Sequence, residues 1–369
     1  MAVVTIDETV SAPARLAEPD EGISEDELRL AARNHGMPLE ALRYDVTPAG
    51  LHYLLIHYDI PYVDPATWTL RVDGHVDRPL TITLDDLHRR PALTRRVTLE
   101  CAGNGRARIT PRPISQPWLD EAVGTAEWTG TPLAPLLAEA GIRDGAVDVA
   151  FTGADHGVER GVEQDYARGL AINEAMLDDV LLVYGMNGHP LPPQHGAPVR
   201  LVVPGWYGMA HVKWLTSIDV LDKPFDGFQN AVAYRVKADA DDPGEPVTRI
   251  EPKALISPPG FPDFQSRTRV VEHGQHELTG RAWSGWGTIT RVEVSVDGGN
   301  SWTDAQLGEP AGAYAWRPWT WAWDAVTPGR YELCARATDE TGRSQPVAQA
   351  WNRQGMANNH AQRVPALVR

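Results

Sequence analysis

LECAGNGR, residues 99–106, is the stretch on which the interpretation of this sequence depends. It places a lone cysteine, Cys101, between an apolar run and a loop that contains two glycines and an arginine. Gly103 and Gly105 would let the backbone approach a bound group closely, and Arg106 would lower the pKa of a nearby thiol. Since an isolated cysteine is also commonly a small buried apolar residue, the loop by itself leaves both interpretations open.

The composition is that of a globular protein. A chain of 369 residues fits two compact domains, and 42% hydrophobic with 22% charged residues is an ordinary balance for packed domains. The formal net charge of −15 argues against a nucleic-acid partner, because phosphate backbones are bound by clustered lysine and arginine. The two cysteines, Cys101 and Cys334, form no C-x-x-C pair, which disfavours a zinc site or a disulfide scaffold.

The amino terminus lacks the features of an export signal. Its first 22 residues carry acids where a secretory leader would have a basic start and an apolar run, and they contain no twin arginine. Nowhere in the sequence do about 18 apolar residues follow one another, which is the length that a membrane span needs. We therefore expect a cytoplasmic protein with reduced cysteines that does not enter a membrane.

The chain begins with an expected arm and an α+β domain. Residues 1–45 are interpreted as the arm, in which Ser24 and Glu27 have the spacing of a helix capping box. Residues 46–240 mix short strands and helices without the regular repeat of a doubly wound sheet. Within this domain we expect strands at 68–74, 147–153 and 181–188, and a helix at 131–141 that ends on Gly141.

The second half of the chain has a different pattern. Residues 237–252 are rich in Asp, Pro and Gly and are interpreted as a linker. Beyond it, residues 247–369 show short strands separated by turn residues, which predicts an all-β, immunoglobulin-like sandwich. The expected strands are 276–283, 290–296, 314–323 and 330–338, with a turn at Asp297-Gly298-Gly299.

LECAGNGR resembles the motif of sulfite oxidases and assimilatory nitrate reductases in which a cysteine binds molybdenum. Further segments resemble that family in the family's own order. They are FTGADHG (151–157), the stretch 183–208 and HVKWL (211–215) for the cofactor domain, and SVDGGNSW (295–302), AYAWRPWTW (313–321) and WNRQGMANN (351–359) for the dimerisation domain. The resemblance implies an α+β molybdopterin-binding domain of sulfite oxidase type, followed by a dimerisation domain, in a homodimer.

The resemblance also implies a cofactor site. Cys101 would be the metal ligand, since a soft thiolate suits a redox-active transition metal. The pterin carries a phosphate, which cationic donors and backbone amides bind. The residues expected to contact the cofactor are His57, Tyr58, Cys101, Asp155, His195, Arg200, His211 and Lys213.

A second group of residues would hold an oxyanion substrate beside the metal. Arg106 and Arg317 match arginines of the family's anion pocket, and Arg317 would bring the second domain into the site, although it could instead stack on Trp316 or Trp319. Tyr234 would hydrogen-bond the metal's oxo group or the substrate, with a buried structural tyrosine as the alternative. Trp118 resembles a tryptophan that lines the same pocket.

His57 marks a departure from the family pattern. The family has arginine at this position, whereas an imidazole carries charge only when it is protonated. Asp59 stands two residues further along the chain, where the family has histidine, and would favour the protonated imidazole. The anion pocket is therefore weaker than in sulfite oxidases, and the substrate is less firmly implied than the cofactor.

The resulting interpretation is oxygen-atom transfer at molybdenum, with sulfite oxidised to sulfate and the electrons passed to an external acceptor such as a cytochrome or oxygen. No C-x-x-C-H haem motif and no G-x-G-x-x-G motif after a strand occur, so neither haem nor NAD is expected. The alternatives are reduction of nitrate or another small oxidised substrate at the same metal, and a thiol hydrolase in which Cys101 is activated by His195 or His211. A binding module without activity would not require Cys101, Arg200 and Lys213 together.

We expect Cys101→Ser to abolish sulfite turnover while the fold is retained, because a hydroxyl is a far poorer ligand for molybdenum than a thiolate. Cys334→Ser is the matched control and should keep turnover close to that of the parent. Steady-state assays with circular dichroism of both variants measure this. Parental rates in both variants would show that Cys101 is not the ligand.

Overall fold

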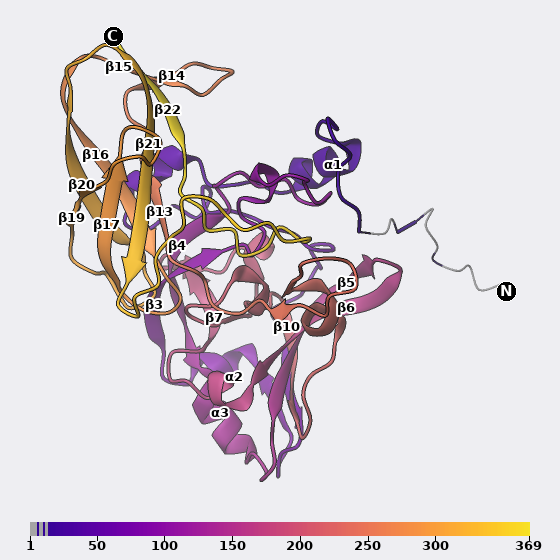
Figure 1. Ribbon diagram of the computed structural model, residues 1–369. Helices are drawn as coiled ribbons and strands as arrows, with labels where there is room; N and C mark the ends of the chain where they lie inside the picture. Colours follow the sequence, from indigo (N-terminus) through magenta and orange to yellow (C-terminus); the bar gives the residue numbers. More distant parts are fainter. Residues whose placement is uncertain (1–5, 7–9, 12–13) are drawn as a thin grey trace.

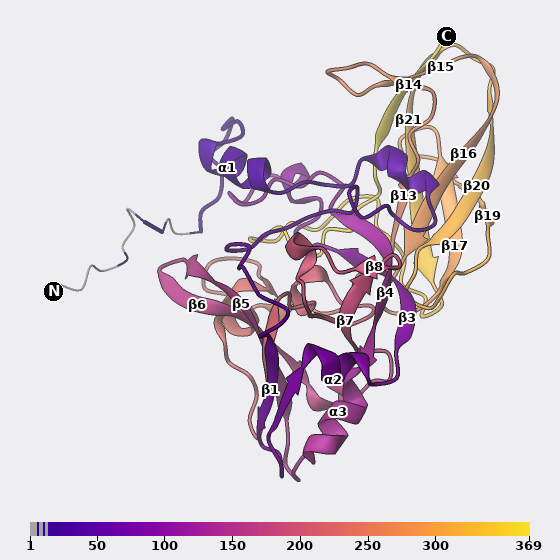
Figure 2. The same ribbon diagram turned by 180° about the vertical axis from the view of Figure 1, so that it is seen from behind.

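The computed structural model describes residue 6, residues 10–11 and residues 14–369 (Figures 1 and 2). Helix α1 (Glu25–Arg33) begins at the predicted capping box, where the Ser24 hydroxyl accepts from the Glu27 amide and the Glu27 carboxylate accepts from the Ser24 amide. The rest of the segment interpreted as an arm includes the 3₁₀ turn η1 (Leu39–Arg43) and buries Met37 and Leu42 in the main core. The earliest residues of that segment, 1–5, 7–9 and 12–13, lie outside the described part of the chain.

Two sheets form the first domain. The order of the first is β2-β1-β10-β5-β6, with β1 and β10 parallel and the other neighbours antiparallel. Its strands are β1 (Thr69–Gly74), β2 (Leu80–Thr83), β5 (Asp148–Glu159), β6 (Val162–Ala171) and β10 (Leu215–Leu221). The order of the second is β3-β4-β7-β8, with β9 paired to β7; its strands are β3 (Leu93–Glu100), β4 (Val123–Pro132), β7 (Leu181–Met186), β8 (His189–Pro190) and β9 (Arg200–Val202).

Short helices cover these sheets. They are α2 (Leu84–His88), α3 (Leu133–Ala140) and α4 (Ile172–Ala175). The predicted helix at 131–141 is confirmed as α3, and it ends at Gly141, whose φ of 75° places it in the left-handed region that favours glycine. The predicted strands at 68–74, 147–153 and 181–188 are confirmed as β1, β5 and β7. Strands such as β7 are buried on both faces, which gives the apolar run that marked them in the sequence.

Strand β3 delivers the cysteine. Its last four residues are buried, and it ends at Glu100, so that Cys101 is the first residue of the loop that follows. The loop continues through Gly105, which has a φ of 86°, into the 3₁₀ turn η2 (Arg106–Arg108). The expected path of this segment, from a strand into a tight glycine loop, is therefore observed.

The carboxyl-terminal part consists of strands. One sheet has the order β13-β16-β20-β19, with β13 (Lys253–Ile256), β16 (Gly274–Trp283), β19 (Gln306–Leu307) and β20 (Arg317–Ala325). The other has the order β14-β15-β22-β21-β17-β18, with β14 (Phe261–Pro262), β15 (Arg269–Val271), β17 (Ile289–Ser295), β18 (Thr303–Asp304), β21 (Gly329–Asp339) and β22 (Val364–Val368). Both sheets contribute to one core that includes Leu278, Val292, Trp319 and Leu333. All four strands predicted for this part are confirmed.

The segment interpreted as a linker is only partly free of structure. The π-helical turn η5 (Gln229–Ala233) and the hairpin of β11 (Arg235–Val236) with β12 (Glu245–Pro246) lead into it, and Val247 and Ile250 are buried in the first domain's core. Two isolated apolar residues give no periodic signal, which is why the sequence did not show that they pack. The described residues contain no helix that is long and apolar enough to cross a membrane.

The segment between β21 and β22 connects the two parts of the molecule. It leaves the strand-rich part and reaches back to the first domain (the yellow loops in Figure 1). The Ala357 amide donates to the Ala102 carbonyl oxygen over 2.8 Å, and the Asn358 side chain donates to the Gly105 carbonyl oxygen over 2.8 Å. The cysteine loop is thus bounded by both parts of the chain.

Candidate active site

Cys101 is fixed by hydrogen bonds of its backbone, and its side chain lines a cavity. Its amide donates to the Ala122 carbonyl oxygen, and its own carbonyl oxygen accepts from the Asn104 amide, both over 2.9 Å. Burial raises the pKa of the Cys101 thiol, while the Arg106 charge, the Gly103 amide and the Trp118 indole N–H act in the opposite direction. A metal cation would deprotonate such a thiol on binding, since a coordinating thiol loses its proton.

The cavity beside Cys101 collects cationic side chains. Arg200 donates to the carbonyl oxygens of His195 and His211 over 3.0 and 3.2 Å, and the Lys213 ammonium donates to the Leu55 carbonyl oxygen over 2.7 Å. The other polar side chains that line this cavity are His52, Tyr53, His57, Asp155, Tyr166, His195, His211 and Tyr234. The structure therefore brings together Cys101 and seven of the residues expected at the site: His57, Asp155, His195, Arg200, His211, Lys213 and Tyr234.

Burial destabilises both strong cations of this cavity. It lowers the pKa of Lys213 to about 7 and that of Arg200 to about 10, and it raises the pKa of Asp155 to about 6. The Arg200 Nε and Asp155 Oδ1 atoms are buried without a hydrogen-bond partner among the described residues. Because buried polar groups are normally satisfied, these atoms indicate that an additional group, with anionic oxygens and its own donors, completes the cavity.

Three histidines of the cavity, His52, His195 and His211, are held in the neutral form. Burial is the largest cause that lowers the pKa of His52 to about 4 and of His211 to about 3, and it holds the pKa of His195 well below its usual range. His211 accepts from the Val203 amide at Nδ1, so Nε2 carries the proton and donates to the Trp206 carbonyl oxygen. His211 therefore lines the cavity, and both of its ring nitrogens are already hydrogen-bonded to the backbone. His52 was missed, because no charged or glycine-rich motif surrounds it in the sequence.

A wider, open cavity joins the first one and shares Leu55, His57, Cys101 and Tyr234 with it. Tyr58, Arg106 and Trp118 also line it, as expected. The Arg106 guanidinium donates to the Gln354 carbonyl oxygen over 3.0 Å, and to Ser115 Oγ and the Gln116 carbonyl oxygen over 3.1 and 3.3 Å. Arg106 is thus fixed beside the thiol by neutral acceptors, which leaves its charge available to an anion.

Tyr234 lies at the junction of the two cavities. It is buried, its ring is 5.8 Å from the Arg168 guanidinium carbon, and burial raises its pKa, so the hydroxyl stays protonated and can donate to a bound oxygen. The Tyr58 hydroxyl accepts from the Gln229 side-chain amide over 3.2 Å. Burial raises the pKa of Tyr58 as well. Both tyrosines are therefore neutral donors at the cavity.

The predicted position of Arg317 is wrong. Its guanidinium donates to the carbonyl oxygens of Gly308 and Ile289, each over 2.7 Å, within the strand-rich domain. Among the described residues it does not belong to the lining of either cavity. Arg317 starts strand β20, and the register of that strand with β16 directs it to neighbouring backbone instead of the cysteine loop.

The expected partner of His57 is also wrong. His57 Nε2 lies 2.9 Å from Glu159 Oε2, whereas Asp59 is exposed and accepts from the amide of Ile60. Glu159 also accepts from the Gln229 side chain over 3.2 Å, and its pKa is lowered by these bonds in spite of burial. The wider cavity therefore contains the carboxylate of Glu159, which sequence spacing did not indicate, since Glu159 is 102 residues away from His57.

Several cavity residues escaped the sequence analysis. Arg160 stands at the β5–β6 turn, Lys237 follows β11, and Arg353 and Gln354 come from the segment that returns from the strand-rich domain; all four line the wider cavity. Arg353 lies in the motif WNRQGMANN. Because that motif was assigned to the dimerisation domain, Arg353 was not expected at the cavity. The second domain does reach the cavity, through this segment and not through Arg317.

Comparison with known proteins agrees with this geometry. The family described as "Oxidoreductase molybdopterin binding domain" matches residues 57–229, and that described as "Mo-co oxidoreductase dimerisation domain" matches residues 261–368. The chain is 35% identical to the mitochondrial sulfite oxidase of Mus musculus over 351 residues, covering 88% of this chain and 62% of that protein. It is 33% identical to "Nitrate reductase [NADH] 1" of Oryza sativa subsp. japonica, covering 85% of this chain and 37% of that protein.

A solved structure is similar over nearly the whole chain. The sulfane dehydrogenase SoxCD from Paracoccus pantotrophus superposes with a TM-score of 0.78 at 28% identity, over 95% of this chain and 87% of that one. Fold and cavity together define a molybdopterin-binding oxidoreductase domain joined to a dimerisation domain. The chain contains these two domains and is similar to sulfite oxidases and nitrate reductases, and it spans 62% and 37% of the length of the two relatives named above.

We expect the cofactor-free protein to lose stability as the pH falls from 7 to 5. His52, His195 and His211 have folded-state pKa values below that of an unfolded histidine, so the unfolded chain binds more protons in this window. Each contributes about 1 kcal/mol of destabilisation per pH unit below about pH 6. His360, whose pKa burial lowers to about 4, acts in the same direction, whereas the raised pKa values of Asp155 and His156 act in the opposite direction.

Calorimetry of the parent and of His52→Gln measures this effect. The variant should show a shallower dependence of the melting temperature on pH, because one of the three histidines is removed. Equal dependence in the two proteins would mean that His52 is not held neutral in the cavity.

Proposed function

We propose that the protein catalyses oxygen-atom transfer at a molybdopterin-bound molybdenum and oxidises sulfite to sulfate. The observation that carries this proposal is the position of the Cys101 thiol between a small cationic cavity and a wider cavity that is lined by Arg106, Arg160 and Arg353. When bound, the molybdenum cofactor supplies the oxo transfer and a two-electron redox couple. The relatives named above span more than this chain, so activity, substrate and partners are proposals.

The described residues fit that cofactor. Cys101 would provide one soft ligand, and Arg200 and Lys213 would provide buried positive charge for a phosphate. The partnerless Arg200 Nε would donate to a phosphate oxygen, whereas the partnerless Asp155 Oδ1 would accept from an N–H donor of the pterin. His57, Tyr58, His195 and His211 complete the walls around the pterin. These contacts orient the group and keep bulk water away from the thiol.

The substrate would be held in the wider cavity. Arg106 presents a guanidinium beside Cys101 and binds one face of an oxyanion, while Trp118 closes the wall. Tyr234 donates its hydroxyl proton in a hydrogen bond to a substrate oxygen and thereby fixes its orientation. The arginines on the rim raise the local concentration of small anions although the whole protein is acidic.

Two alternatives are weighed against this. Nitrate reduction at the same metal is favoured by Glu159. Its carboxylate lies in the wider cavity and repels a dianion such as sulfite more strongly than a monoanion such as nitrate. A thiol hydrolase, with His195 or His211 as the base, is disfavoured. His211 has both ring nitrogens bonded to backbone groups, and burial holds the pKa of His195 well below its usual range, so that it is a poor base for Cys101.

The finer features of the molecule belong to the same proposal. The two sheets of the strand-rich part, with short strands and a shared core, support an immunoglobulin-like sandwich. The match to a dimerisation domain supports a homodimer. A cytoplasmic location and reoxidation by an external acceptor, a cytochrome or oxygen, are proposed from the sequence alone.

Purified protein should contain about one molybdenum per chain and oxidise sulfite with ferricyanide as acceptor. Nitrate with reduced viologen should give turnover at least tenfold lower. Metal analysis and the two assays are run on the same preparation. Molybdenum without sulfite turnover, but with nitrate turnover, would support the alternative substrate, and absence of molybdenum from cofactor-replete cells would refute the metal assignment.

Glu159→Gln should lower KM for sulfite by roughly three- to tenfold near pH 8, since it removes one negative charge from the cavity while an amide still bonds His57 and Gln229. Glu163→Gln, an exposed change on strand β6 of the same hairpin, is the control and should leave KM unchanged. An unchanged KM in Glu159→Gln would place the substrate outside the reach of this carboxylate.

A further inference from the structure

A buried ion pair joins the two domains next to the cysteine loop. Lys253 Nζ lies 3.3 Å from Glu100 Oε1, and the two side chains are 0% and 1% exposed. Lys253 begins strand β13 of the second domain, whereas Glu100 ends strand β3 and immediately precedes Cys101. A charge buried so deeply is strongly unfavourable without its partner, so each side chain fixes the other.

Glu100 is fully engaged by the groups around it. Its Oε2 accepts from the Trp283 indole N–H over 2.8 Å, and its Oε1 accepts from the Asn104 side-chain amide over 3.0 Å as well as from Lys253. Trp283 also belongs to the second domain, on strand β16. The carboxylate next to Cys101 is therefore positioned by a lysine and a tryptophan that the first domain does not provide.

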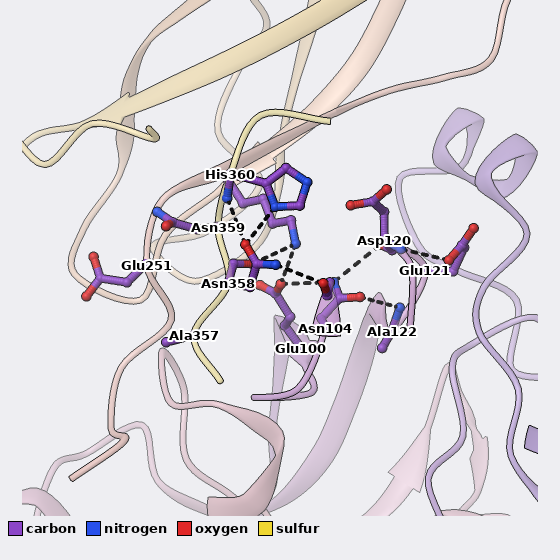
Figure 3. A network of polar contacts seen from close by, with 12 residues as sticks. Glu100, Asn104, Asp120, Glu121, Ala122, Glu251, Ala357, Asn358, Asn359 and His360 are labelled. Atoms are coloured by element: carbon purple, nitrogen blue, oxygen red, sulfur yellow. Dashed lines mark hydrogen bonds and ion pairs between the residues drawn. The ribbon is translucent and has the colours of Figure 1, made fainter. Parts of the chain in front are cut away.

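Asn104 carries this positioning to Cys101. Its Oδ1 accepts from the Ala122 amide over 3.1 Å, and Ala122 in turn accepts the Cys101 amide over 2.9 Å. The backbone N–H of Asn104 donates to the Cys101 carbonyl oxygen over 2.9 Å. Figure 3 shows Glu100, Asn104 and Ala122 side by side in this arrangement. Cys101 is thus bonded on one side to the backbone of Asn104 and on the other side to Ala122, which the Asn104 side chain positions, and Glu100 orients that side chain.

Lys253 also acts on the far end of the loop. It donates to the Asn358 carbonyl oxygen over 3.2 Å, and the Asn358 side chain donates to the Gly105 carbonyl oxygen over 2.8 Å. A Cβ at Gly105 would lie 2.8 Å from the Asn358 amide nitrogen, so the loop and the second domain are in close contact there. A fully satisfied buried network of this kind specifies one arrangement of its members.

We propose that Lys253 and Glu100 are positioning residues for the Cys101 thiolate, so that the second domain sets the geometry of the metal ligand. This inference rests on the proposed molybdenum site, but it concerns the protein's own loop. Lys253 would act without touching substrate or cofactor, since it lies outside the lining of both cavities among the described residues. Partners that orient a metal ligand are expected to change metal affinity or activity by about 10- to 100-fold when removed.

The first test uses the full chain produced in cells that cannot make molybdopterin, with iodoacetamide as the probe. Lys253→Met leaves Glu100 charged and unpaired, and we expect Cys101 to be alkylated about tenfold faster because the loop opens more often. Cys334, buried in the second domain, reports global opening in the same sample and should accelerate far less than Cys101. Equal acceleration at both cysteines would mean that the pair only stabilises the fold, and would overturn the proposal.

Two further variants test whether Lys253 acts on Cys101 through Glu100. Glu100→Gln/Lys253→Met removes both charges and should return the Cys101 rate to within about threefold of the parent, since no buried charge is left unpaired. A double variant that stays as fast as Lys253→Met would show that Lys253 does not act through Glu100, contrary to the proposal. Arg336→Met, which breaks the Arg336–Glu293 pair of the second domain, is the matched control and should leave the Cys101 rate unchanged.

The holoprotein provides the second readout. Lys253→Met should lower kcat for sulfite by about 10- to 100-fold, leave KM within about twofold, and shift the thiolate-to-metal charge-transfer absorption. Unchanged kcat and an unchanged spectrum would overturn the proposal. Should the parent not oxidise sulfite, the alkylation rates and the spectrum still decide the role of Lys253, so failure of the proposed substrate and failure of this inference are distinguishable.

Discussion

The burial of Arg200 and Lys213 beside Cys101 is the constraint on which the rest of this structure depends. Both cations are taken out of water, and Asp155 is the acid that faces Lys213 from the cavity wall. Backbone carbonyl oxygens fix their positions but supply no full negative charge. Such a cavity is stable when an anionic group occupies it, which is why a phosphate-bearing pterin fits it better than a neutral ligand.

The rest of the fold places the Cys101 thiol and the substrate entrance beside the charges of Arg200 and Lys213. Strand β3 ends where the thiol has to lie, and the open cavity with Arg106 begins on the other side of it. The second domain is part of this arrangement in two ways. Its returning segment lines the entrance through Arg353 and Gln354, and its Lys253 reaches the carboxylate that precedes the cysteine. The second domain therefore contributes directly to the site.

Local signals predicted much of the fold, and motif order predicted most of the cavity. The alternation of β16, β17 and β21 and the glycine end of α3 are properties of neighbouring residues, so they are visible in the sequence. The cavity residues from Asp155 to Lys213 lie in segments that resemble a known family. The pairs that were missed join distant positions: Glu159 with His57 across 102 residues and Lys253 with Glu100 across 153. Arg317 was misplaced because the register of β20, and not the motif around it, decides where its side chain points.

The central claim is that the Cys101 thiolate is a ligand of molybdenum in this cavity. X-ray absorption at the molybdenum edge of the purified parent and of Cys101→Ser tests it most directly, because it counts the sulfur atoms bound to the metal without reference to any substrate. The account predicts one sulfur neighbour fewer in the variant. An unchanged sulfur count, with metal present in both proteins, would contradict it.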